Sequence, residues 1–226
     1  MKIFEIVDTL YEMAMPSDIH RSMTYYHGTT DAKAAKSIMK NGIQPRSVTL
    51  AKRDSRTRVN LNPVEGKVYI TPNLGYAQMY ALGGDVAGSN YQPKDRKYGF
   101  MAVIDGKEIK DIQPDEDSVG EIIYNAMREN SLDPFLIRMA NTVRASLTPN
   151  QLRQFRDGEY DMWAHTGKKL LKKMSDSDKL RFIDFGAHIA HEGALIPSAM
   201  WRIDLKYIPN LKKDGSNFFE FAKQIG

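Results

Sequence analysis

The 226-residue sequence predicts an α+β fold, on three observations. Short β-like runs lie in the first half of the chain and again near its C-terminus. The segment between them has the spacing of apolar residues that helices require. Because a lone hairpin is only marginally stable, the first and last strands should share one sheet. We therefore expect a single domain over 1–226, with an N-terminal helix over 1–20 and a helical insertion over 117–190.

The N-terminal segment, MKIFEIVDTLYEMAMPSD, has apolar residues at roughly helical spacing, which predicts an amphipathic helix. It lacks a basic region and carries Glu5, Asp8 and Glu12, so it is not typical of a secretory signal. We expect this helix to pack against the domain, with docking to a partner as the alternative.

The first strand and the helix after it have clear boundary signals. The aromatic run MTYYHGT over 23–29 is typical of a strand. Asp31 is placed to cap the following helix, and Gly42 is placed to end it. The next segment, 46–58, holds five lysines and arginines against one acid and has little apolar periodicity, which indicates a basic loop.

Two further strands follow in the first half of the chain. GKVYIT over 66–71 predicts a strand, and the Pro-Asn pair after it starts a helix that should stop at Gly83. FMAVID over 100–105 predicts the third strand, closed by a turn at Gly106.

Helices are expected in the middle of the chain, where Pro134 and Pro149 fit the first turns of two of them. The expected ranges are 118–130, 134–147, 149–157, 160–174 and 177–190. The pattern then returns to β-like runs over 194–200 and 201–208, the second of which alternates between apolar and polar residues. The C-terminal FFEFAKQIG predicts a short final helix.

Composition excludes several classes of function. The chain has no cysteine, which excludes disulfides, thiolate zinc sites, iron–sulfur ligation and a cysteine nucleophile. Its 32 basic and 28 acidic residues give a net charge of +4, which is too mild to indicate nucleic-acid binding without clustering. No apolar run approaches the ~20 residues that span a bilayer. We expect a cytoplasmic protein with no membrane partner.

Three short motifs hold residues that are candidates for ligand binding or catalysis. His27-Gly28-Thr29 ends a strand, and a glycine there lets a flat ligand approach the backbone. Tyr69 lies on the next strand and Tyr80 on the helix after it, and aromatic rings of this kind can sandwich a planar heterocycle. A carboxylate, Glu192, interrupts the apolar run 188–200, where it is costly unless satisfied or functional. The alternatives are a glycine turn, core packing and an exposed helix-end acid.

The three motifs, in this order, resemble the ADP-ribosyltransferase fold family, in the His–Tyr–Glu branch of the poly(ADP-ribose) polymerases and diphtheria-type toxins. The resemblance lies in YYHGTTDAKAAKSIMKNGIQP, GKVYITPNLGYAQMYA and HEGALIPSAMWRIDLKYI. It implies a split antiparallel β-sandwich with NAD in the cleft between two sheets, NAD as a substrate, and no metal.

The resemblance also implies a role for each motif residue. His27 would hydrogen-bond the adenosine ribose, and the backbone of Gly28 would hold the nicotinamide carboxamide. Tyr69 and Tyr80 would stack on either side of the nicotinamide ring. Glu192 would bind the 2′-hydroxyl of the nicotinamide ribose and, with His27 and Tyr69, would be catalytic. A carboxylate also fits the chemistry directly, because cleaving the nicotinamide–ribose bond develops an oxocarbenium-like cation.

The chain departs from the family at two positions. The polymerases have a serine eight residues after the strand tyrosine, where this chain has Ala77. Arginine-modifying members have a second Glu or Gln two residues before the catalytic Glu, where this chain has Ala190. The first departure weakens the expected hold on the carboxamide, and the second argues against arginine as the acceptor.

Other groups complete the expected NAD site. Thr29 belongs to the first motif, and Arg46 and Arg53 of the basic loop could clamp the NAD pyrophosphate through bidentate bonds. The same loop could instead guide a nucleic-acid acceptor. His188 and His191 would lie one helical turn apart, but their spacing matches no zinc-protease motif, so we expect no metal.

The sequence therefore predicts an NAD-dependent mono-ADP-ribosyltransferase whose acceptor is a macromolecule, protein first and nucleic acid second. The alternatives are a non-catalytic partner- or nucleic-acid-binding module on the same fold, an NAD hydrolase, and an enzyme like the RNA 2′-phosphotransferases. The start of the chain resembles the N-termini of tailed-phage proteins, which implies a phage effector in the host-cell cytoplasm.

Overall fold

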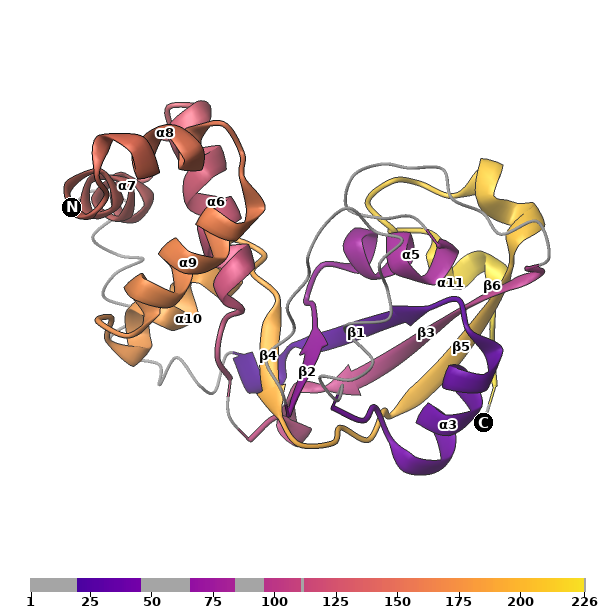
Figure 1. The fold of residues 1–226 in the computed structure, drawn as a ribbon. Coiled ribbons are helices and arrows are strands. Elements are labelled where there is room, and N and C mark those ends of the chain that lie inside the picture. The colour runs from indigo at the N-terminus through magenta and orange to yellow at the C-terminus, as the bar shows by residue number, and fades with distance from the viewer. Residues whose placement is uncertain (1–19, 46–65, 84–95, 111, 226) are drawn as a thin grey trace, which may run out of the picture. The chain divides into compact units, whose positions relative to one another are not determined.

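The computed structural model describes residues 20–45, 66–83, 96–110 and 112–225, and divides the chain into two compact units (Figure 1). The first, the sheet unit, comprises 1–47, 64–112 and 190–226. The second, the helical unit, comprises 48–63 and 113–189. The N-terminal helix expected over 1–20 lies outside the described residues except for its last position, and the basic loop 46–58 lies outside them entirely.

The sheet unit is built on a four-stranded antiparallel sheet, which confirms the α+β class. Its strands lie in the order β1 (Thr24–Thr29), β3 (Tyr98–Asp105), β5 (Ala199–Asp204) and β6 (Ala222–Gln224). Strands β1 and β5, which correspond to the first and last strands expected from the sequence, therefore share one sheet, as the sequence predicts.

Helices α5 (Leu74–Leu82) and α11 (Phe218–Phe221) pack against one face of this sheet. The buried side chains at this contact include Ala77, Ala81 and Met101. Helix α5 lies so close to the strands that a methyl group on Gly28 would stand 2.5 Å from the backbone nitrogen of Ala81. The absence of a side chain at Gly28 is thus a condition for this helix–sheet contact.

A second, two-stranded sheet pairs β2 (Lys67–Ile70) with β4 (Ile189–Glu192). The amide of Gly193, just after β4, donates to the carbonyl of Gly66, just before β2, at 3.3 Å. The end of one strand therefore lies beside the start of the other, and the two run antiparallel. Between β1 and β2, one isolated antiparallel bridge joins Tyr26 to Thr71.

Local boundary signals set the helices of the first half of the chain. Asp31 caps α3 (Ala32–Asn41), because its carboxylate accepts the amide of Lys33 at 2.8 Å. Helix α3 packs against β1 and β3, on the other side of the sheet from α5 (Figure 1). Helix α5 ends at Gly83 in the left-handed conformation, as expected.

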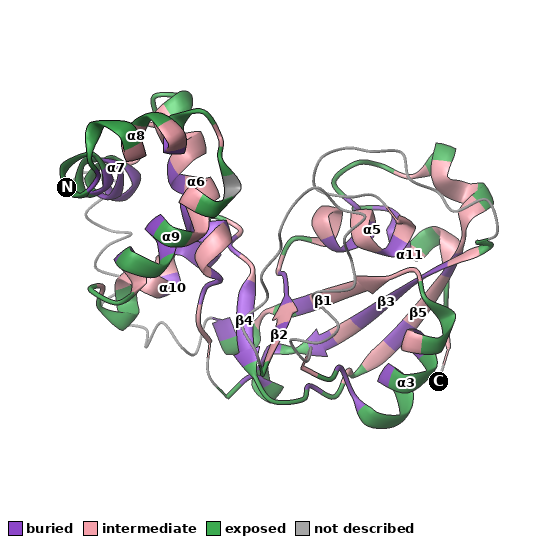
Figure 2. Ribbon diagram, viewed as in Figure 1, coloured by how far each residue is buried: buried purple, intermediate pink, exposed green. Residues whose placement is uncertain are grey.

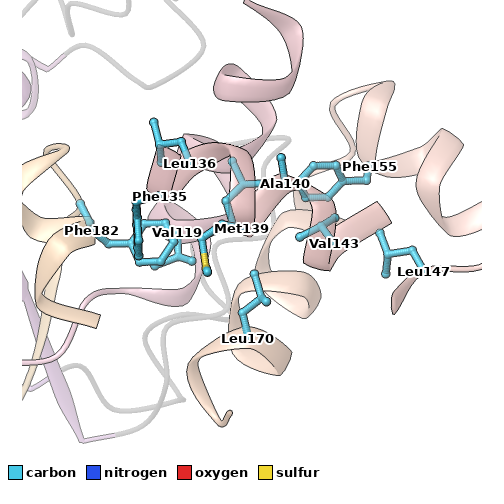
Figure 3. Close-up of a cluster of buried hydrophobic side chains, with 12 residues drawn as sticks. Val119, Phe135, Leu136, Met139, Ala140, Val143, Leu147, Phe155, Leu170 and Phe182 are labelled. Atoms are coloured by element: carbon cyan, nitrogen blue, oxygen red, sulfur yellow. The ribbon is translucent and has the colours of Figure 1, made fainter. Parts of the chain in front are cut away.

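The helical unit consists of α6 (Glu116–Arg128), α7 (Pro134–Ser146), α8 (Pro149–Arg156), α9 (Tyr160–Leu171) and α10 (Asp176–Asp184). The prolines begin α7 and α8, and Thr148 forms a full capping box with Gln151. The apolar faces of the helices meet in one core, drawn in Figure 3, and Figure 2 shows exposed residues on the outer turns of these helices.

Glycines allow α6 and α9 to cross closely. A methyl group on Gly120 would stand 2.6 Å from the carbonyl carbon of Trp163, and one on Gly167 would stand 2.8 Å from that of Glu116. The two backbones therefore approach closely at both glycines, and a larger side chain at either position would not fit this crossing.

The helix expected over 177–190 is wrong in its second half. Helix α10 ends at Asp184, and Gly186 adopts φ +88. The amides of Gly186 and Ala187 donate to the carbonyls of Ile183 and Phe182, which is the pattern of a glycine-terminated helix. The apolar residues that follow belong to strand β4, because a short apolar run does not by itself distinguish a strand from a helix.

The strands expected over 194–200 and 201–208 are also corrected. One strand, β5, spans their junction, and a 3₁₀ helix, η2 (Leu205–Asn210), follows it. The carboxylate of Asp204 accepts the amide of Lys206 and starts this turn. The turn expected at Gly106 is a 3₁₀ helix, η1 (Gly106–Glu108), and the C-terminal helix is a single turn, α11, that leads into β6. Among the described residues, no helix has both the length and the apolar character to cross a membrane.

Candidate functional site

The three sequence motifs fall on neighbouring strands of the sheet unit. His27 lies on β1, Tyr69 on β2 and Glu192 at the end of β4. Strand β2 is joined to β1 by the Tyr26–Thr71 bridge and to β4 by the two-stranded sheet, as Figure 1 shows. Residues far apart in the sequence therefore come together along the order β1, β2, β4.

The imidazole of His27 is tied directly to the tyrosine strand. Its Nδ1 lies 3.0 Å from the carbonyl oxygen of Tyr69. A carbonyl only accepts, so Nδ1 carries the proton, and Nε2 of the neutral ring is an acceptor. An acceptor of this kind suits a hydroxyl group, such as that of a ribose.

The backbone of Gly28 faces the side on which β1 and β2 separate. Tyr26 exchanges both of its backbone hydrogen bonds with Thr71, at 2.8 and 3.0 Å. In an antiparallel strand the N–H and C=O of alternate residues point to the same side, so those of Gly28 also point toward β2. Opposite Gly28, the carbonyl of Tyr69 is bonded to His27 instead. Within the described ranges, no residue of β2 bonds the amide or carbonyl of Gly28.

This pair of backbone groups has a specific chemical complement. One N–H donor and one C=O acceptor on the same residue match a primary amide, which offers one acceptor and two donors. The edge at Gly28 can therefore bind a carboxamide through two hydrogen bonds, as the family resemblance implies.

The helix side of Gly28 is filled by α5. Tyr80 lies against it, with its Cβ 3.0 Å from where a methyl group on Gly28 would stand. Ala77 is fully buried in the same contact, so the place of the family's serine is occupied here by the helix–sheet packing. The structure thus brings Tyr80 to Gly28. The close packing of α5 is by itself enough to require a glycine at this position, whether or not a ligand binds there.

The carboxylate of Glu192 is exposed, with 75% of its side-chain surface accessible. Its Oε1 lies 4.0 Å from Nζ of Lys67, whose side chain is largely covered, and an ion pair this long with an exposed acid contributes little stability. Lys67 and Tyr69 are two residues apart on β2 and share one face of that strand. Glu192 therefore lies on the same face as Tyr69, at the open end of the small sheet.

Other predicted residues are placed as follows. The hydroxyl of Thr29 accepts the amide of Asp31 at 3.2 Å and so belongs to the turn before α3. Arg46 and Arg53 lie outside the described residues. The histidine pair is not on a helix, because His188 precedes strand β4 and His191 lies within it. No group of three potential metal ligands occurs in the described parts of the chain.

Sequence reasoning missed Lys67 as the neighbour of Glu192. The sequence showed only a lysine at the start of a short strand. That Glu192 is its neighbour follows from the pairing of β2 with β4, which lie more than a hundred residues apart in the chain. It also missed the cations that lie over the ring of Tyr98. Searches against protein-family models, curated proteins and solved structures found no match to this chain.

Proposed function

We propose that this chain is an NAD-dependent mono-ADP-ribosyltransferase built on the split antiparallel sandwich of the ADP-ribosyltransferase fold. One observation carries the proposal: His27, Tyr69 and Glu192 lie on three neighbouring strands, beside the backbone edge of Gly28, which no described residue of β2 bonds. This arrangement supports a site that holds a carboxamide and a ribose side by side.

In the proposed reaction, the bond between C1′ of the ribose and the nicotinamide nitrogen breaks, and nicotinamide leaves neutral with the bonding electrons. A nucleophilic atom of the acceptor bonds to C1′ and gives up its proton to solvent or to Glu192. Glu192 stabilises the cationic sugar, as the carboxylates of glycosidases do. The edge of Gly28 holds the leaving group in one orientation, and His27 accepts a hydrogen bond from a ribose hydroxyl.

The main alternative is a non-catalytic binding module on the same fold. The exposure of Glu192 and its pairing with Lys67 favour this alternative, because an effective catalytic carboxylate usually works in a water-excluded site. A hydrolase that transfers ADP-ribose to water uses the same residues and differs only in the acceptor. A 2′-phosphotransferase-like enzyme would depend on arginines rather than on Tyr69 and Glu192.

The test is nicotinamide release from NAD, followed by chromatography, with and without a cell lysate. Glu192→Gln removes the charge at constant size, and Glu220→Gln makes the same change at another exposed acid of the sheet unit. We expect release by the native protein to fall by about 10²–10³ in Glu192→Gln. Release by Glu220→Gln should stay within about twofold of the native rate.

Mass spectrometry of the lysate distinguishes the products. An ADP-ribose increment on lysate molecules supports a transferase, and free ADP-ribose alone supports a hydrolase. If the native protein neither binds NAD nor releases nicotinamide, the enzyme proposal is refuted. Equal rates for native protein and Glu192→Gln would refute the role of Glu192.

A further inference from the structure

The sheet unit is rich in cations in its described part. Its described residues include fourteen lysines and arginines against seven aspartates and glutamates, a net charge of +7 with histidine neutral. Residues 113–189 of the helical unit include eleven basic and twelve acidic side chains, a net charge of −1. Over the full sequence the two units carry the same net charge of +2, so a binding surface has to be argued from where individual cations lie.

Strand register places two of these cations directly opposite each other. Arg202 on β5 faces Lys223 on β6, and both are on the face of the sheet that carries His27. Like charges directly opposite on neighbouring strands destabilise a sheet. Two cations in this position are therefore costly to the free protein and indicate a surface that an anion can cover.

One of these cations, Arg202, lies over an aromatic ring together with a third cation, Lys97. The guanidinium carbon of Arg202 lies 4.5 Å from the ring centre of Tyr98, and Nζ of Lys97 lies 5.3 Å from it. A guanidinium that lies on a ring is planar and pre-ordered, and its fork matches the oxygens of a phosphate. We call Lys97, Tyr98, Arg202 and Lys223 the cationic cluster.

A described acid beside this cluster is already engaged. Asp204 lies opposite Tyr98, but its carboxylate contacts Nζ of Lys206 at 3.7 Å and accepts the amide of the same residue. None of the three cations of the cluster forms an ion pair with a described acid. Their charge is thus available to an external anion.

A second group of lysines, in the helical unit, has an ordinary structural reason. Lys168, Lys169, Lys172 and Lys173 lie at the C-terminal end of α9. Cations there are stabilised by the helix dipole and need no ligand. They are exposed, and none of them lies over an aromatic ring of the described residues, so they serve as a control for the cationic cluster.

We infer that the cationic cluster binds the backbone of a single-stranded nucleic acid. Single strands are bound by cations that follow the phosphates together with flat side chains on which bases stack. The cluster offers both, with Lys97 and Lys223 for phosphates and the stacked Arg202–Tyr98 pair for a base. Its role as the docking site for a nucleic-acid acceptor rests on the proposed function, whereas the binding itself does not.

Binding is measured by fluorescence anisotropy with labelled twelve-nucleotide oligouridine and oligothymidine over a series of salt concentrations. We expect binding at about 50 mM salt that weakens as salt rises. The pair Lys97→Gln and Lys223→Gln should lower the slope of log K against log salt by about 1.4, since each single-strand phosphate contact contributes about 0.7. The control pair Lys168→Gln and Lys172→Gln should leave the slope unchanged.

Arg202→Lys separates charge from stacking. It keeps the positive charge, so the salt slope should stay, while loss of the planar group should weaken binding about tenfold. Comparison of the RNA and DNA oligonucleotides shows whether the 2′-hydroxyl contributes.

Three results would overturn the inference. They are no binding of either oligonucleotide at 50 mM salt, equal losses in the cluster pair and the control pair, and binding of polyglutamate as tight as that of the oligonucleotides. Nicotinamide release from NAD alone is measured on the same variants. If release is absent while oligonucleotide binding follows the expected pattern, the proposed function fails and the binding surface stands.

Discussion

A methyl group on Gly28 would test the helix–sheet contact on which the candidate site rests. In Gly28→Ala, the new Cβ would stand 2.5 Å from the backbone nitrogen of Ala81 and would overlap the carbonyl oxygen of Ala77. Both obstacles are backbone atoms, so no rotamer change relieves them. To reach the 3.4 Å at which ordinary contact begins, α5 must retreat from β1 by at least 0.9 Å for the Ala81 nitrogen, and by more for the Ala77 oxygen.

A retreat of this size has a definite energetic consequence. A gap of 0.5–1 Å forfeits about a quarter to a half of the dispersion energy of the atoms that line it. Overpacking of this kind costs about 1–3 kcal/mol, and a backbone obstacle puts Gly28→Ala near the upper end. With a urea m-value of about 2 kcal/mol/M, the unfolding midpoint of the sheet unit should fall by about 1.5 M.

The assay is urea unfolding followed by tryptophan fluorescence. The chain has two tryptophans, so a Trp163→Phe background leaves Trp201, which packs against the α5 contact, as the reporter of the sheet unit. Gly193→Ala is the control, because Gly193 has φ +85 and nothing within 4 Å of the added methyl. That variant should lose only the ~1–2 kcal/mol of a left-handed alanine. A midpoint for Gly28→Ala at or above that of Gly193→Ala would refute the reasoning.

Two further predictions concern the helical unit, each read from urea midpoints with Trp163 as reporter in a Trp201→Phe background. Alanine usually stabilises a helix interior by about 1 kcal/mol over glycine. Gly167→Ala should instead lower the stability of the helical unit by about 2–3 kcal/mol, since the added methyl would meet the backbone of Glu116. A raised urea midpoint in this variant would contradict the close crossing of α6 and α9. Burial raises the pKa of Asp115 well above its usual range, with smaller contributions from Asp117 and Glu116. The folded form thus holds the proton more tightly, and stability falls as pH rises from the unfolded pKa toward the folded one. Asp115→Asn should raise the urea midpoint at pH 7 and remove this fall in stability, and an unchanged pH profile in the variant would contradict the prediction. His188 has the opposite effect on the pH profile. Burial lowers its pKa to about 4, so the stability it contributes is lost as pH falls from about 6.5 toward 4.

Local signals predicted the helix boundaries well. The three predicted helix starts are confirmed: Asp31 is the N-cap of α3, and Pro134 and Pro149 are the first residues of α7 and α8. These signals can be identified from the sequence because a cap or a first-turn proline acts on residues within one turn. The error over 177–190 arose where a local signal, Gly186, competed with an apolar run that fits either a helix or a strand.

Long-range pairing was beyond the sequence. The contact of His27 with the carbonyl of Tyr69 joins residues 42 apart, and the pairing of Lys67 with Glu192 spans far more. A shift of register by one residue turns every side chain of a strand to the other face, so periodicity alone cannot assign such contacts. The alternation around Arg202 indicated a strand, but the opposition of Arg202 and Lys223 depends on β6, which was predicted as a helix.

The order of the elements along the chain has a consequence for biosynthesis. The whole of α6 to α10 lies between β3 and β4. The two ends of this segment are joined by a hydrogen bond, in which the amide of Asp115 donates to the carbonyl of His188 at 2.7 Å. A ribosome therefore releases the complete helical unit while the sheet unit still lacks β5 and β6. Since units fold as they emerge, the helical unit can form first. Until β5 has been synthesised, the edge of β3 that will pair with it stays uncovered. A chaperone that shields strand edges should therefore associate with nascent chains that end before β5.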